Sequence, residues 1–200
     1  MIYIDIDETV RDLLIPIKEQ HGIEPTAWHD WDTKINGKGF CSFVTKDISL
    51  NAPLTKFGYA LWLDALEYNS TLRHFFWHEH EVRFLTGAIH RDETVEWMNK
   101  KFKTPLRACS SLIFVKDTAE KYQYLKDCDW FIDDCPKFVA YPDLKWKWIC
   151  IPQAYNHGVT CYRRTDDIKE IAKIVKYKSN KLTDWENTEK SIHQVSETVW

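Results

Sequence analysis

Five short apolar runs, separated by amphipathic segments, constrain the fold of this chain more than any other feature of its sequence. The runs are MIYID (1–5), VRFLTG (82–87), SLIFV (111–115), WFIDD (130–134) and WKWICIP (146–152). Such near-continuous apolar runs are typical of strands that are buried on both faces. Residues 91–102 carry acids early and lysines late, as the helix dipole favours, and residues 166–177 keep helical apolar spacing. The alternation predicts an α/β fold with a doubly wound parallel sheet.

Length and composition limit the classes of protein to which the chain can belong. Two hundred residues suffice for one core domain with a small insert. The formal net charge of -3 favours neither a nucleic-acid nor a membrane partner. No apolar run approaches the ~18 residues of a membrane-spanning helix, so we expect a cytoplasmic protein. The six cysteines lack Cys-x-x-Cys spacing and several lie in apolar runs, which predicts buried free thiols.

Polar side chains follow three of the expected strands at the points where the strands end. Asp5 and Asp7 alternate after the first strand, so their side chains leave it on the same side. The second strand ends in Thr86-Gly87 and the fourth in Asp133-Asp134. Because ligands of such folds gather beyond the carboxyl ends of the strands, we expect these groups to converge there.

This set of groups suits a phosphate ester and a hard cation. Carboxylates as close as Asp5 and Asp7 repel each other unless a cation or a shared proton compensates them. Taken alone, the pair would also fit an acidic loop. Oxygen ligands suit Mg²⁺, which takes its remaining ligands from water and substrate phosphate. Lys121, which opens the helix before the fourth strand, and the Thr86 hydroxyl suit phosphate oxygens.

Taken in order, these elements resemble the four motifs of the haloacid dehalogenase-like (HAD) phosphatases. The matching stretches are DIDET, with Asp5, Asp7 and Thr9; FLTG, with Thr86 and Gly87; EKYQYL, with Lys121; and FIDD, with Asp133 and Asp134. The resemblance implies a Rossmann-like core. It also implies that Asp5 is the nucleophile, which becomes an aspartyl-phosphate, and that Asp7 is the general acid and base. Thr86, Gly87 and Lys121 would bind the phosphoryl group.

The resemblance further implies a Mg²⁺ site formed by Asp5, the backbone carbonyl of Asp7, and Asp133. Asp134 and Thr9 would support it, the Thr9 hydroxyl by bonding the backbone of the turn. A metal ion and a lysine are the groups that offset repulsion between a carboxylate and an anionic ester. Lys116 is a second candidate for the lysine, but the order lysine, helix, strand, Asp-Asp favours Lys121.

The long segment between the first two strands is expected to be a cap. It is too long for a βα connection, and an insert at this point of a HAD phosphatase implies a cap over the active site. The predicted domains are a core at 1–12 and 80–177, a small, mainly helical cap at 13–79, and a tail or terminal helix at 178–200. Within the cap we expect helices at 12–20 and 54–68 and a loop at 33–40. Aromatic residues near that loop are candidates for stacking on a nucleobase: Trp28, Trp31, Phe40 and Phe43.

Two further stretches resemble the 5'(3')-deoxyribonucleotidase branch, namely ETVEWMNKKF (93–102) and ICIPQAYNHG (149–158). This resemblance implies hydrolysis of nucleoside monophosphates to nucleoside and phosphate. The alternatives are a phosphatase for another small ester or for a nucleic-acid or protein end, and a non-catalytic binding module. No basic groove for nucleic acid is evident in the sequence, and a homodimer is left open.

Two other patterns have weaker functional interpretations. In HFFWHEHE (74–81), His74 and His78 would share a helix face but His80 would not, so a solvated helix end fits better than a zinc site. Arg11 and Arg91 follow the first two strand ends and are candidates for phosphate or cap-closing contacts.

Overall fold

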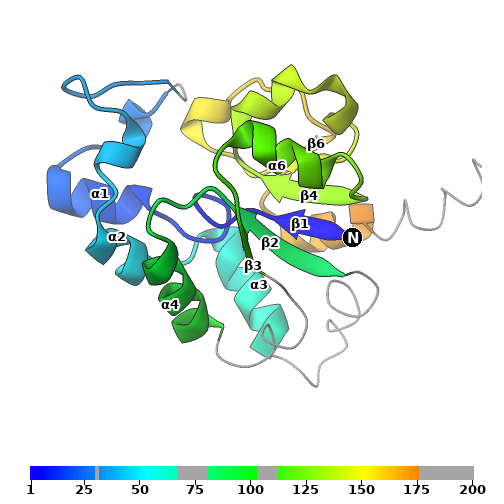
Figure 1. The fold of residues 1–200 in the computed structure, drawn as a ribbon, viewed down its shortest axis with the longest axis horizontal. Helices are drawn as coiled ribbons and strands as arrows, with labels where there is room; N and C mark the ends of the chain where they lie inside the picture. Colours follow the sequence, from blue (N-terminus) through cyan, green and yellow to red (C-terminus); the bar gives the residue numbers. More distant parts are fainter. Residues whose placement is uncertain (30–31, 67–80, 103–111, 176–200) are drawn as a thin grey trace, which may run out of the picture.

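A six-stranded parallel sheet forms the centre of the computed structural model, which describes residues 1–29, 32–66, 81–102 and 112–175. The strands are β1 (Ile2–Ile4), β2 (Val82–Thr86), β3 (Leu112–Phe114), β4 (Trp130–Asp133), β5 (Trp148–Cys150) and β6 (Arg163–Arg164). Their order is β3-β2-β1-β4-β5-β6, and every neighbouring pair is parallel. The predicted α/β fold with a parallel sheet is therefore confirmed, and helices cover both faces as in a doubly wound fold (Figure 1).

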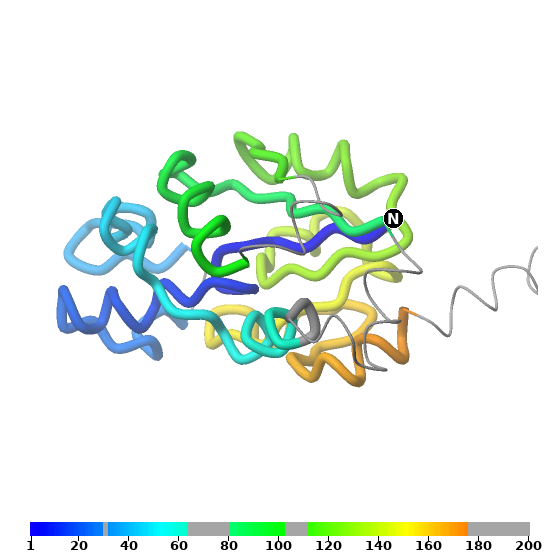
Figure 2. The backbone as a smooth tube through the Cα atoms, turned by 90° about the horizontal axis from the view of Figure 1, so that it is seen from below, coloured from blue at the N-terminus to red at the C-terminus, as the bar shows by residue number. Residues whose placement is uncertain are grey.

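Successive side chains of each strand point to opposite faces of the sheet, so the core around the sheet consists of two clusters, one on each face. On one face Ile2, Ile4, Phe84 and Ile132 pack against α3 (Lys56–Leu66), α4 (Arg91–Lys101) and the helical segment at 168–175. Figure 2 shows α3 in cyan and this last segment in orange on the same side of the strands. Because each strand is buried on both faces, it needs apolar residues at nearly every position.

The opposite face carries the alternate residues. Tyr3, Leu85, Phe131 and Trp148 pack there with Leu125 of α6 (Thr118–Leu125). The short helical turns η4 (Pro136–Ala140) and η5 (Pro142–Leu144) complete this layer.

Four of the ten tryptophans rank among the largest fully buried side chains: Trp28, Trp97, Trp130 and Trp148. These four tryptophans therefore belong to the core.

A third apolar cluster lies beyond the carboxyl ends of the strands, where the blue segments stand apart in Figure 1. It comprises α1 (Leu14–His21), α2 (Lys46–Asn51) and two short turns, η1 (Pro25–Ala27) and η2 (Phe40–Ser42), with Trp28 buried between them. The cluster ends at Ala52. The helix α3, which falls within the range expected for the cap, packs with the sheet instead through Phe57 and Leu61.

The structure also contains the other helices and the loop that the sequence predicts within the described residues. Of the helices at 12–20, 54–68 and 91–102, each has a counterpart in α1, α3 or α4. In the loop at 33–40, Asn36 and Gly37 have positive φ and join Ile35 to Lys38 in a tight turn. None of the described helices is long and apolar enough to cross a membrane. Five of the cysteines are described and all five are free thiols, but burial is confirmed only for Cys128, Cys135 and Cys150, because Cys41 is exposed and Cys161 half-buried. Trp31, His74, His78, His80, Cys109 and the tail at 178–200 lie outside the described residues.

Candidate active site

The ends of β1 and β4 bring Asp5, Asp133 and Lys121 into direct contact. The two strands are neighbours, and the point between them is where the strand order changes direction, which in such sheets opens a crevice. Lys121 Nζ donates a hydrogen bond to Asp133 Oδ2 at 2.6 Å. The same nitrogen lies 2.8 Å from Asp5 Oδ1, at ion-pair distance but without hydrogen-bond geometry. All three side chains are buried.

Burial and crowding of like charges define the electrostatics of this cluster. Burial raises the pKa of Asp5 well above its usual value; Lys121 opposes this shift, and the Asp133 and Asp134 carboxylates add to it. Although burial disfavours its charge, Asp133 and Asp5 raise the pKa of Lys121 above the ordinary lysine value. The ammonium therefore stays charged while the acids around it are poorly compensated.

Asp134 lies beside this cluster and is held by two hydroxyl groups. Thr9 Oγ1 donates to its Oδ1 at 2.9 Å, and the Tyr155 hydroxyl donates to its Oδ2 at 2.5 Å. The prediction that Thr9 bonds the turn backbone is wrong, because its hydroxyl reaches across to β4 instead. Burial, with help from the Asp133 charge, raises the pKa of Asp134 to about 7 against the two hydrogen bonds.

Three carboxylates converge closely enough to hold a metal ion. One oxygen each of Asp5, Asp133 and Asp134 lies within 4.8 Å of the others, and all three residues are buried. A bound cation would supply the positive charge that the raised pKa values of Asp5 and Asp134 show to be lacking. The donor set, hard oxygens only, fits Mg²⁺ and equally fits other hard cations. The residues present therefore fit the implied metal.

Thr86 is the last residue of β2, on the other side of Asp5, and Gly87 follows it. Thr86 is fully buried, and its Oγ1 accepts a hydrogen bond from the Ala88 N–H at 3.2 Å. Gly87 lines the cavity with no atom close to the position of a Cβ. Of the two candidate lysines, Lys121 contacts Asp5, whereas Lys116 is exposed at the cavity wall.

Asp7 is fixed by Arg11, four residues further along the chain. Arg11 donates from Nε and Nη2 to Asp7 Oδ1, at 2.8 and 2.5 Å. The guanidinium also donates to the Ser49 carbonyl at 2.7 Å and to Thr94 Oγ1 at 3.0 Å, and it is buried. Arg11 thus contacts both Asp7 and Ser49 of the third cluster, and its role in closing a cap stays a prediction. Arg91, by contrast, is exposed and stacks on Phe114.

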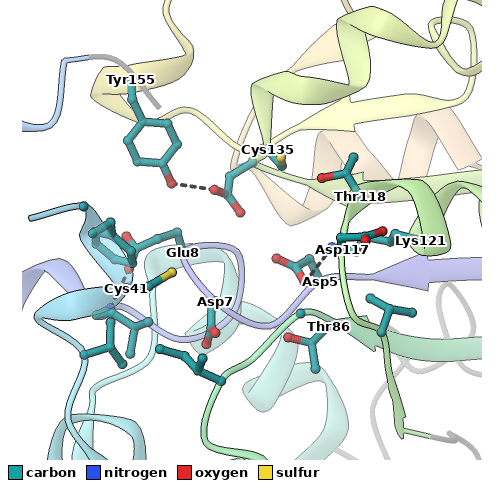
Figure 3. Close-up of a pocket in the computed structure, with 18 of the residues that line it drawn as sticks. Asp5, Asp7, Glu8, Cys41, Thr86, Asp117, Thr118, Lys121, Cys135 and Tyr155 are labelled. Carbon is teal, nitrogen blue, oxygen red and sulfur yellow. Dashed lines mark hydrogen bonds and ion pairs between the residues drawn. The ribbon is translucent and has the colours of Figure 1, made fainter. Parts of the chain in front are cut away.

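These groups open on one cavity of about 350 Å³. Figure 3 shows Asp5, Asp7, Thr86 and Lys121 around it. Gly87 and Asp134, which were also predicted for the site, line it too. Residues of the third cluster also line it, namely Leu13, Trp28, Phe40 and Val44, together with Cys41 of η2. Asp133 does not line the cavity, so Asp134 is the member of the Asp-Asp pair that faces a ligand.

Two residues of the site were missed in the sequence. Glu8 lines the cavity in a left-handed backbone conformation, and burial raises its pKa well above the usual value, with Asp12 and Asp134 adding to the effect. Tyr155 stands out in the sequence only as part of an aromatic-Asn turn, and it reaches Asp134. The position of Glu8, directly between Asp7 and Thr9, was the available signal, but a sequence does not show where that side chain turns.

Comparison with protein-family models found no match for this chain, and comparison with curated proteins found none either.

Proposed function

We propose that the protein is a metal-dependent phosphomonoesterase that acts through an aspartyl-phosphate on Asp5, with nucleoside monophosphates as the leading substrates. The observation that carries this proposal is the convergence of Asp5, Lys121 and Asp134 with the buried Thr86 along the wall of one cavity. A nucleophile, a cation, a metal-binding carboxylate and a hydroxyl are the groups that phosphoryl transfer requires.

In the proposed first step, an oxygen of Asp5 attacks phosphorus and the bond from phosphorus to the leaving oxygen breaks. Asp7, in its protonated form, gives a proton to that oxygen, and Arg11 fixes the orientation of the Asp7 carboxyl group through Oδ1. In the second step Asp7 takes a proton from water, the water oxygen attacks phosphorus, and phosphate leaves as the Asp5 carboxylate is restored. Lys121 and the Thr86 hydroxyl hold the phosphoryl oxygens in both steps.

Asp5, Asp133 and Asp134, with the Asp7 carbonyl, would hold the Mg²⁺ ion. When bound, the ion supplies positive charge that lets a carboxylate approach an anionic ester. Asp133 already accepts hydrogen bonds on both oxygens, from Lys121 and from the Cys135 N–H. Since Asp134 faces the cavity, we propose that it shares the role expected for Asp133.

The cavity supports a small substrate with a flat leaving group. Its volume of about 350 Å³ lies in the range of small-molecule sites. Trp28, Phe40 and Tyr155 line it, and stacking on an aromatic ring contributes ~1–3 kcal/mol per base. A site of this size favours a nucleotide over the end of a nucleic acid or protein, which needs an open groove.

The test is hydrolysis of p-nitrophenyl phosphate and of 5'- and 3'-monophosphates, deoxy against ribo. Mg²⁺ should be required, a chelator should stop the reaction, and added Mg²⁺ should restore it. Asp5→Asn should abolish turnover, whereas Asp127→Asn, at an exposed acid outside the cavity, should keep it. Full activity of Asp5→Asn, or turnover in the presence of chelator, would contradict the mechanism; a preference for sugar phosphates over nucleotides would contradict the substrate class.

A further inference from the structure

Glu8 is held in place through three of its four polar atoms. Its N–H donates to the Arg11 carbonyl, its own carbonyl accepts from Gln153 Nε2, and its Oε1 accepts from the Leu13 N–H, each at 2.7 Å. The backbone has a φ of 58°, a conformation that a residue with a side chain rarely adopts. Such conformations persist where the surroundings enforce them, and they occur often at ligand sites.

The fourth polar atom, Glu8 Oε2, is buried and has no hydrogen-bond partner among the described residues. Glu8 is only 3% exposed, yet it lines the cavity. In Figure 3 its side chain extends away from Asp5, toward the side of Cys41. The charged groups that act on it most strongly are Asp12, Asp134 and Asp7, all of them acids. A buried carboxylate oxygen normally has a donor, and a ligand N–H in the cavity is the natural source of one. Such a bond favours the ionised carboxylate and so opposes the effect of burial, which raises the pKa of Glu8.

Trp28 presents a matching unused group from the third cluster. Its Nε1 is buried and lacks a hydrogen-bond partner among the residues that the structure describes. The ring lines the same cavity and is fixed edge-on by Phe40 and Phe43, with centroids 5.3 and 5.7 Å away. Buried indole N–H groups usually find an acceptor. The cavity wall therefore offers one acceptor, Glu8 Oε2, and one donor, Trp28 Nε1, that the described residues leave unused.

We propose that Glu8 and Trp28 form the subsite that selects the leaving group, with Glu8 Oε2 accepting from an N–H group and Trp28 Nε1 donating to an oxygen. The proposal rests on the proposed phosphatase function and adds the chemistry of the substrate to it. Asp5, Lys121 and Thr86 hold the phosphoryl group at their side of the cavity, and the leaving group extends to this subsite. The N–H donor can come from the imide edge of a base or from an ammonium group.

Two matched pairs of substrates distinguish these sources. The first is uridine 5'-monophosphate against its N3-methyl derivative, and the second is phosphoethanolamine against phosphocholine. In each pair methylation removes the N–H donor and keeps the phosphate ester. We expect kcat/KM to fall roughly 10- to 100-fold on methylation in one of the two pairs, as expected for an unpaired buried polar group. The pair that responds identifies the donor.

Glu8→Gln tests whether Glu8 is the acceptor. If the amide oxygen keeps the bond to Leu13, the amide nitrogen replaces Oε2, so an acceptor becomes a donor. This variant should lose most of the discrimination within the responding pair. Glu19→Gln, an exposed change on α1 outside the cavity, should keep it. Trp28→Phe, which retains an aromatic ring and removes the N–H, should lower kcat/KM for the responding substrate and should leave the dependence on the substrate N–H intact.

The outcomes of these experiments distinguish a failure of the proposed subsite from a failure of the proposed function. Wild-type protein that fails to hydrolyse p-nitrophenyl phosphate with Mg²⁺ contradicts the phosphatase function. Hydrolysis without discrimination in either pair contradicts the subsite alone, and this comparison needs no variant to fold. Discrimination that survives in Glu8→Gln also overturns the assignment of Glu8.

Discussion

Lys121 is the residue on which the charge balance of the site depends. Its ammonium contacts Asp5 and Asp133 inside a buried acidic cluster. Removing one partner of a buried ion pair leaves charge uncompensated and costs about 3–5 kcal/mol. We predict a loss of this size for Lys121→Met, measured as the free energy of unfolding in urea at pH 7 with chelator present.

The pH dependence of this loss follows from the raised pKa of Lys121. A cation whose pKa is raised by folding stabilises the fold fully below its unfolded value, about 10.4, and the effect is lost only above that. The difference between wild type and Lys121→Met should therefore persist from pH 7 to pH 9 and shrink in acid, where the carboxylates are protonated. Lys126→Met, at an exposed lysine, serves as control, and equal stability of the two variants would contradict the assignment.

Asp134 should make the metal-free protein less stable as pH rises. Its pKa is about 7 in the fold and about 3.9 in an unfolded chain, so the native state binds more protons between these values. The free energy of unfolding should then fall between about pH 4 and about pH 7, by at most about 1.36 kcal/mol per pH unit. Burial also raises the pKa of Asp5 and of Glu8, so both carboxyl groups should lower the stability of the metal-free protein as pH rises.

Urea titrations at several pH values with chelator present measure this slope. Asp134→Asn should reduce it, and Asp127→Asn, at an exposed acid, should leave it unchanged. If the free energy of unfolding of the wild type rises between pH 4 and pH 7, the prediction is wrong, and the fold ionises Asp134 at little cost.

At the level of residues, the sequence allowed prediction of the acids but not of all their partners. Asp5 and Asp133 could be placed because each ends a recognisable apolar strand. Glu8 could not, since its side chain reaches the cavity from a left-handed backbone that contacts with Arg11 and Leu13 in the same loop and a tertiary contact with Gln153 hold in place. Such a conformation depends on the assembled fold, which a local pattern does not contain.

At the level of elements, α3 is tied closely to the loop that follows β1. Thr55 Oγ1 donates to the Thr9 carbonyl at 2.6 Å, and the Thr55 N–H donates to the Val10 carbonyl at 3.0 Å. A Cβ at Gly58 would lie 2.1 Å from that Val10 oxygen. The helix can approach the backbone this closely only because residue 58 has no side chain.

We therefore predict that Gly58→Ala destabilises the protein, although alanine in a helix interior normally gains up to about 1 kcal/mol over glycine. The clash with backbone should cost about 1–3 kcal/mol, measured by thermal or urea unfolding. Gly39→Ala, where no atom lies within 4 Å of the new Cβ, should leave stability nearly unchanged. A gain in stability for Gly58→Ala would mean that α3 packs less closely against the loop.

Elements with a strong apolar signal were predictable, and those held mainly by tertiary pairing were not. β2 and β4 match the predicted runs because burial on both faces leaves little freedom in their composition. β6 is a pair of arginines, Arg163 and Arg164, that joins the sheet only by pairing with β5. The position of α3 on the sheet face could not be predicted either, since an amphipathic pattern does not indicate which surface the helix packs against.

For the whole molecule, one arginine connects the sheet to the third cluster. Arg11 donates to the Ser49 carbonyl of α2 and to Thr94 of α4, and it stacks on the Trp97 ring at 5.2 Å. Trp97 in turn donates to the Ala52 carbonyl at 2.7 Å. The third cluster has its own apolar residues, so this polar network is an important part of what fixes it over the cavity.

We predict that Arg11→Met loosens the third cluster more than the sheet. The methionine keeps apolar bulk but leaves Asp7, Ser49 and Thr94 without their shared donor, which should cost about 3–5 kcal/mol. Amide hydrogen exchange under native conditions should show protection lost first in α1 and α2 and retained in β1 and β4. Lys56→Met, which breaks only the exposed ion pair with Asp166, should change stability by at most about 1 kcal/mol. Equal loss of protection in all elements would mean that the molecule unfolds as one unit and that Arg11 supports the sheet as much as the cluster above it.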